Sequence, residues 1–153
     1  MAEIVLQFVE GSGFGSGMIK WFGHGAYSHV DSVLPDGRLL GARNDAVGGV
    51  KPGVRIRPAD YVASENVSRV VLLVGDRMRD DYYAFIDAQL GRAYNKTAIL
   101  AFAFGAEWSN PEAWFCSQLV AAGLQACGYL PKLSEPANKI DPDDLRLILS
   151  ALA

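Results

Sequence analysis

The arrangement of apolar and polar residues predicts two long strands and one short strand. Residues 4–9 form an apolar run with a single glutamine inside it, and residues 68–74 are rich in β-branched side chains. Both patterns are typical of strands that are at least half buried. Residues 54–57 lie between segments broken by glycine and proline, which is typical of a short strand at the edge of a sheet.

Two further apolar runs flank a strong turn signal and predict a β-hairpin. The runs cover residues 26–34 and 39–43, and the turn is Pro35-Asp36-Gly37. Proline favours the first central position of a tight turn, and glycine accepts the positive φ that follows. His29 and Asp31 therefore lie in the first hairpin strand, and they share a face because strand side chains repeat every two residues.

Four segments predict helices. One follows Asp76, the expected N-cap, and another covers residues 98–104, which are apolar on all sides. A third begins at Cys116, and a fourth follows Asp141, where proline occupies the first helical position. Together with the strands, these helices predict an α+β fold in which one antiparallel sheet packs against a few helices, as a single domain covering residues 1–153.

Composition excludes several classes of function. The chain is 50% hydrophobic and 20% charged, with a net charge of −3. Its lysines and arginines form no cluster along the sequence. We therefore expect no nucleic-acid binding. The longest apolar run, residues 98–106, is shorter than the roughly 20 residues of a membrane span, so no transmembrane segment is expected. The N-terminus has no basic region followed by an apolar stretch, so it predicts no signal peptide.

The cysteines and histidines predict neither a disulfide nor a metal site. Cys116 and Cys127 lie on one predicted helix at a separation of about 16 Å, which is too long for a disulfide. This fits a reducing cytoplasm. The two histidines and two cysteines have no ligand spacing, so we expect no metal. The glycine-rich residues 11–17 lack the spacing of a dinucleotide loop, and no cofactor is expected.

Cys116 is the first candidate for chemistry. A cysteine in the first turn of a helix lies near unpaired N–H groups and the positive end of the helix dipole, which favours the thiolate, the nucleophilic form. The alternative is a small buried hydrophobe, the usual state of a free cysteine. His29 is the histidine that a predicted element would hold, although a lone strand histidine is often only structural. His24 lies between two glycines, with no predicted element around it.

Four motifs follow one another in a suggestive order. Ser28-His29-Val30 comes first, followed by Gly91-Arg92-Ala93-Tyr94-Asn95, then Phe115-Cys116-Ser117-Gln118-Leu119-Val120, and finally Ile140-Asp141-Pro142-Asp143-Asp144-Leu145. This order resembles the circularly permuted branch of the NlpC/P60 superfamily, papain-like thiol hydrolases in which the strand that carries the histidine precedes the helix that carries the cysteine. The resemblance covers residues 27–145 and implies the papain-like NlpC/P60 fold in permuted order.

The resemblance implies acyl transfer by a cysteine and histidine pair. Cys116 would attack a carbonyl as a thiolate, and His29 would hold the proton and return it to the leaving group. The backbone N–H of Cys116 and the hydroxyl of Tyr94 match the positions that stabilise the oxyanion. The alternative for Tyr94 is a half-buried tyrosine with its hydroxyl at the surface.

One position departs from the pattern of the family. Relatives place a polar residue on the second hairpin strand to orient the histidine, and here that position is Gly41. Asp31 could take over the orienting role if its side chain adopted a bent rotamer. The favoured interpretation of Asp31, however, is a solvated aspartate in the hairpin. Arg43, Asn44 and Asp45 are further candidates. Losing the orienting residue of a triad lowers the rate by orders of magnitude without abolishing the chemistry.

Three functions are consistent with the sequence. The first is a cysteine peptidase or amidase that cleaves an amide in a cell-wall peptide or a similar small substrate. The second is an esterase or acyltransferase acting on a lipid ester, with an apolar groove formed by Phe102, Phe104, Trp108 and Trp114. The third is an inactive binding module, for instance a structural part of a phage particle, which Gly41 favours.

Overall fold

The computed structural model describes residues 1–10, 26–94, 113–133 and 139–153. The strands are β1 Ala2–Glu10, β2 His29–Val33, β3 Leu39–Arg43, β4 Gly53–Arg57, β5 Asn66–Val74, β6 Ala93–Tyr94 and β7 Ala113–Trp114. The helices are α2 Asp76–Ala88, α4 Cys116–Ala126 and α5 Pro142–Leu152. None of these helices is long and apolar enough to cross a membrane.

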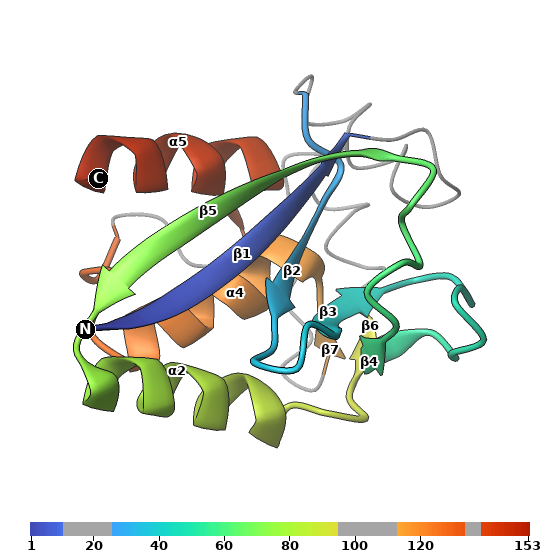
Figure 1. The fold of residues 1–153 in the computed structure, drawn as a ribbon, viewed down its shortest axis with the longest axis horizontal. Coiled ribbons are helices and arrows are strands. Elements are labelled where there is room, and N and C mark those ends of the chain that lie inside the picture. Colours follow the sequence, from blue (N-terminus) through green and yellow to red (C-terminus); the bar gives the residue numbers. More distant parts are fainter. Residues whose placement is uncertain (11–25, 95–112, 134–138) are drawn as a thin grey trace.

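The main sheet has five antiparallel strands in the order β4-β3-β2-β1-β5 (Figure 1). The predicted hairpin is confirmed as β2 and β3, and Gly37 has the expected positive φ of 87° in its turn. The strand predicted for an edge is also confirmed, because β4 closes one side of the sheet. The three helices of the described residues pack against the sheet, so the predicted α+β class is confirmed.

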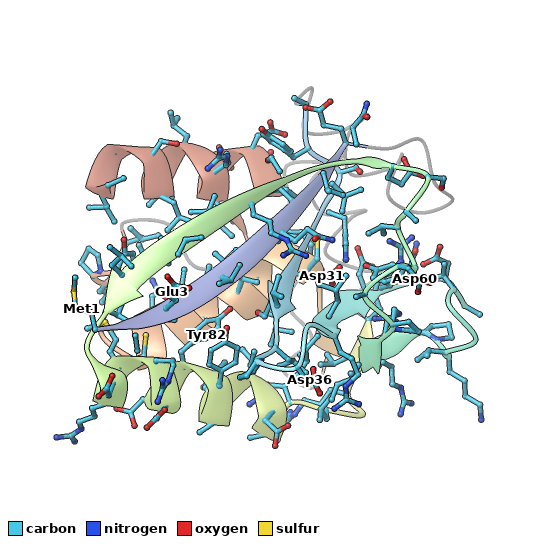
Figure 2. The ribbon with its side chains drawn as sticks, in the orientation of Figure 1. Met1, Glu3, Asp31, Asp36, Asp60 and Tyr82 are labelled. Atoms are coloured by element: carbon cyan, nitrogen blue, oxygen red, sulfur yellow. The ribbon has the colours of Figure 1, made fainter. Side chains whose placement is uncertain are left out.

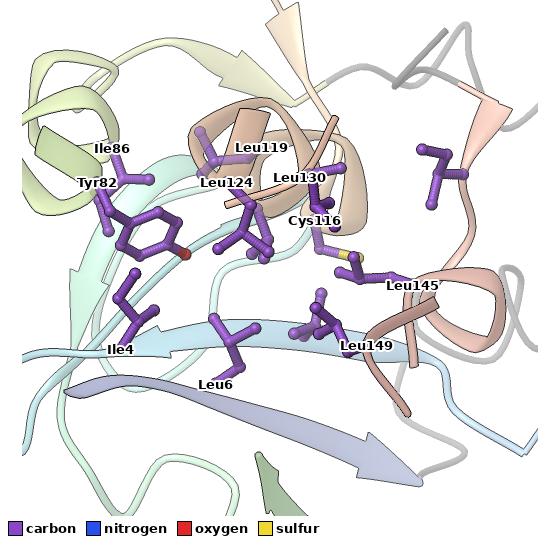
Figure 3. Packing of buried hydrophobic residues seen from close by; sticks show 14 of the residues in the cluster. Ile4, Leu6, Tyr82, Ile86, Cys116, Leu119, Leu124, Leu130, Leu145 and Leu149 are labelled. Carbon is purple, nitrogen blue, oxygen red and sulfur yellow. The ribbon is translucent and has the colours of Figure 1, made fainter. Parts of the chain in front are cut away.

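The core lies between β1, β2 and the helices. Ile4, Leu6 and Phe8 alternate along β1 and are fully buried against the helices, because strand side chains on one face repeat every two residues. Figure 3 shows this apolar interior, where Tyr82 of α2 lies near Ile4. The core fixes the register of the sheet because a slip of one residue would turn the apolar face outward.

The start of α2 differs from the prediction. Gly75 is the N-cap and Asp76 is the first helical residue, with no side-chain hydrogen bond at the cap. Asp76 still lies in the first turn, where a carboxylate favours the helix dipole. The helix ends at Ala88, and Leu90 lies beyond it and is 37% exposed.

The other two described helices begin where the sequence predicts. The N-cap Asp141 accepts a hydrogen bond from the Asp144 N–H at 2.7 Å, and Pro142 follows at the first helical position of α5. Helix α4 begins at Cys116. The helix predicted over residues 98–104, the glycine-rich residues 11–17 and His24 lie outside the described residues, as do Phe102, Phe104 and Trp108.

Candidate active site

His29 and Asp31 form a buried pair on β2. Nitrogen Nε2 of His29 lies 2.8 Å from Oδ1 of Asp31, and the two residues are only 3% and 1% exposed. Side chains two residues apart on a strand are separated by about 6.5 Å at the backbone, so these two bend toward each other. The interpretation of Asp31 as a solvated hairpin aspartate is wrong, because a solvated carboxylate would be exposed. Figure 2 shows Asp31 on β2 and Asp36 at the turn that follows.

Gly41 leaves the space that Asp31 occupies. A Cβ atom at position 41 would lie 1.9 Å from Oδ1 of Asp31 and 3.0 Å from its Cγ, far inside van der Waals contact. Strands β2 and β3 pair at two positions near the hairpin turn, Ser32 with Leu40 and Val33 with Leu39. Beyond these pairs, the Asp31 carboxylate packs directly against the backbone of Gly41. Gly41 therefore makes room for a carboxylate from the neighbouring strand.

The second oxygen of Asp31 is also bonded. The hydroxyl of Tyr61 donates a hydrogen bond to Oδ2 of Asp31. Tyr61 lies in the turn between β4 and β5, where its own N–H donates to the Pro58 carbonyl at 3.2 Å. Sequence reasoning missed Tyr61 because a turn residue 30 positions from Asp31 has no strand or helix spacing that points to it. The carboxylate is thus held on both oxygens.

A buried arginine supports the same corner of the sheet. Arg57, at the end of β4, is 1% exposed and donates hydrogen bonds to four backbone carbonyls, those of Gly41 at 3.0 Å, of Gly53 and Lys51 at 3.3 Å, and of Arg55 at 3.5 Å. Burial opposes ionisation of Asp31, but His29, the Tyr61 hydroxyl and the charge of Arg57 together lower its pKa. Asp31 is therefore a carboxylate.

Cys116 lies beside His29. The thiol is at the first residue of α4, is fully buried and belongs to the main apolar core, as Figure 3 shows. Burial lowers the pKa of His29, whereas the charges of Asp31 and Cys116 and hydrogen bonding to both raise it, with a net value of about 9. Because Nε2 is bonded to Asp31, Nδ1 is the ring nitrogen that can form a hydrogen bond with the Cys116 sulfur. The arrangement favours a protonated imidazole paired with the Asp31 carboxylate beside the Cys116 sulfur.

Two local contacts fix the beginning of α4. The side chain of Gln118 folds back to accept a hydrogen bond from the Phe115 N–H at 3.3 Å. The hydroxyl of Ser117 donates to the Ile140 carbonyl at 2.6 Å, which ties the helix to the segment that leads into α5. The first bond gives a partner to a backbone N–H at the start of the helix. Motif residues on either side of Cys116 thus hold the position of the thiol.

Tyr94 reaches the same neighbourhood through the small parallel sheet. Its strand β6 pairs with β7, so that Tyr94 lies opposite Trp114, two residues before Cys116. Burial raises the pKa of Tyr94, and the negative charge of Cys116 raises it further. The hydroxyl is therefore a neutral donor near the thiol. Tyr94 is half-buried, and its role as an oxyanion donor stays a prediction.

Arg43 and Asp45, two of the three other candidates for orienting His29, bind each other. Two guanidinium nitrogens of Arg43 donate to the two oxygens of Asp45, at 2.7 and 2.9 Å. Burial raises the pKa of Asp45, but the hydrogen bond and charge of Arg43, with a smaller effect of the His29 charge, lower it overall. In the described part of the chain, Asp31 is thus the carboxylate bonded to the imidazole.

The described residues contain no group of three or more histidine, cysteine and acidic side chains that could hold a metal ion. Cys116 and Cys127 are both free. Comparison with protein-family models and with curated proteins finds no match to this sequence. The inference of function therefore depends on the geometry of Cys116, His29 and Asp31.

Proposed function

We propose that this protein is a thiol hydrolase that cleaves an amide bond in a small peptide-like substrate, with the circularly permuted NlpC/P60-like fold. The observation that carries the proposal is the buried ion pair of His29 and Asp31 beside a cysteine at a helix start. A nucleophile, a proton carrier and a group that orients the carrier are the three elements of covalent acyl transfer.

The reaction would proceed in two steps. The Cys116 thiolate attacks the carbonyl carbon, and the resulting tetrahedral intermediate collapses to a thioester as protonated His29 donates its proton to the leaving amine. Water then attacks the thioester, His29 accepts a proton from that water, and the thiolate is released with the free acid. The Tyr94 hydroxyl and the first N–H groups of α4 are the candidate donors to the oxyanion.

Asp31 gives this mechanism its orienting group. An imidazole that donates its Nε2 proton to a carboxylate keeps Nδ1 directed to the thiol, and the negative charge stabilises the imidazolium that the first step needs. Gly41 suggested an inactive module because it cannot orient a histidine. The Asp31 carboxylate, packed against Gly41, removes that objection. Cys116 is fully buried, so substrate entry requires a local opening around the sulfur.

Substrate cleavage with matched cysteine variants tests the proposal. We expect the wild-type protein to cleave short peptide p-nitroanilides, and Cys116→Ala to reduce the rate by about 10³-fold or more. Cys127→Ala, which removes the other free thiol, should retain the wild-type rate. Rapid cleavage of p-nitrophenyl esters with no cleavage of anilides would indicate an esterase instead. Equal rates for wild type and Cys116→Ala would contradict thiol catalysis altogether.

A further inference from the structure

Two buried arginines lie in the neighbourhood of the Asp31 carboxylate. Its charge interacts with buried Arg57 as well as with His29. Arg43 is almost fully buried nearby, with its guanidinium carbon 5.4 Å from the centre of the Tyr61 ring, and the guanidinium carbon of Arg57 lies 6.0 Å from the same centre. If the Asp31 carboxylate rotated toward either cation, Oδ1 would leave His29 without its partner. Some group must hold Asp31 in place.

We propose that Tyr61 is a positioning residue of the active site, whose hydroxyl holds Oδ2 of Asp31 so that Oδ1 faces His29. This inference rests on the proposed function, because a positioned imidazole matters only if His29 carries protons for Cys116. Tyr61 reaches His29 only through Asp31.

Tyr61 is itself fixed on several sides. The next residue, Val62, is buried in a second apolar cluster with Val9, Val33 and Leu39, against which the Tyr61 ring packs. The backbone of Gly48 also approaches closely, since a Cβ atom there would lie 3.0 Å from Cβ of Tyr61. The arginines cover the ring as cation–π partners. The hydroxyl is therefore presented to Asp31 by a rigid support.

A neutral donor suits this role better than either arginine. Arg57 donates to backbone carbonyls, and both oxygens of Asp45 bind Arg43, so the two cations have other acceptors. A bidentate arginine on Asp31 would neutralise the charge that stabilises protonated His29. Burial and the charge of Asp31 raise the pKa of Tyr61, so the phenol stays neutral. The hydroxyl thus fixes the carboxylate and leaves its charge for the imidazole.

The variant Tyr61→Phe tests the role because it keeps the ring and removes only the hydroxyl. We expect the pKa of His29, measured by NMR titration of histidine-labelled protein, to fall from about 9 toward its ordinary value. Modification of Cys116 by a small thiol reagent at pH 6 should slow by about tenfold or more, because misplacing a catalytic group weakens it strongly. Tyr83→Phe is the matched control, since its hydroxyl donates at 2.7 Å to the Val33 carbonyl of the same strand.

The outcomes separate the two proposals. A wild-type His29 with an ordinary pKa, together with a Cys116 no more reactive than Cys127, would reject the proposed function itself. A wild-type protein with the expected values and a Tyr61→Phe variant indistinguishable from it would overturn the role of Tyr61 alone. If Tyr61→Phe fails to fold, the hydroxyl proton of Tyr61 in the wild-type protein is measured by NMR instead. A signal that is protected from exchange with water and disappears in Asp31→Ala supports the role. A hydroxyl proton that exchanges freely in the wild-type protein rejects it.

Discussion

Replacing Gly41 with alanine is expected to disable the site and to destabilise the fold. The new Cβ would lie 1.9 Å from Oδ1 of Asp31, far inside van der Waals contact, so the carboxylate must move away from His29. Forcing a methyl group into packed structure costs about 1–3 kcal/mol, and we expect a loss of unfolding free energy in that range by urea denaturation. The reactivity of Cys116 should fall by about 100-fold.

Gly75→Ala is the matched control for this substitution. Gly75 has an ordinary φ of −71°, and a Cβ there would have no heavy atom within 4 Å. It should retain the reactivity of Cys116. A Gly41→Ala protein with wild-type thiol reactivity would show that the Asp31 carboxylate is not needed where the structure places it.

A double substitution separates the steric effect from the chemical one. Asp31→Ala combined with Gly41→Asn removes the carboxylate that blocks position 41 and returns a polar side chain to β3, where the resemblance places the orienting residue. We expect this protein to be more reactive at Cys116 than Asp31→Ala alone. Gly41→Asn with Asp31 intact should be the least reactive of the set, because both side chains then compete for one space.

Replacing Asp31 with asparagine is expected to change the charge state of His29. The substitution keeps an oxygen that can accept from Nε2 but removes the negative charge that raises the pKa of His29 to about 9 against the opposing effect of burial. We expect the pKa of His29 to fall by about 2 or more, since burial alone lowers the pKa of an imidazole. NMR titration measures this value. An unchanged pKa would mean that Asp31 does not control the imidazole.

The same substitution should alter the pH dependence of stability. A histidine whose folded pKa is above its unfolded value stabilises the folded state fully below about pH 6.5, and this contribution is lost as the pH rises through about 9. For His29 it amounts to roughly 3 kcal/mol. Asp31, whose pKa is lowered, contributes above its unfolded pKa and loses that contribution as the pH falls. Asp31→Asn should therefore weaken the change in unfolding free energy with pH, both on the alkaline side and on the acid side.

The parts of the fold that local signals determine could be predicted from the sequence. The turn at residues 35–37 and the cap at Asp141 depend on residues within one turn of chain, and Cys116 was placed correctly at a helix start. The N-cap predicted at Asp76 lies one residue earlier, at Gly75. Both glycine and aspartate are common at N-caps, so residue preference alone does not distinguish the two positions.

The environment of His29 depends on contacts between distant segments, which periodicity does not encode. Asp31 was expected to be solvated because most aspartates are, yet Tyr61 and the empty space at Gly41 give it partners and room inside the protein. Gly41 was interpreted as a missing residue, whereas in the structure it is a close approach between backbone and carboxylate. A glycine in a strand is a signal for such an approach, and this signal could have pointed to Asp31.

The rate at which a small thiol reagent modifies Cys116, compared with Cys127 in the same molecule, tests the central claim most directly. The pKa of Cys127 is raised by burial, and that residue has no histidine partner among the described contacts. At pH 6, mapped by mass spectrometry, Cys116 should react at least about tenfold faster than Cys127 even though it is more buried, and His29→Ala should abolish the difference. A Cys116 that reacts more slowly than Cys127 in both proteins would contradict an activated thiol.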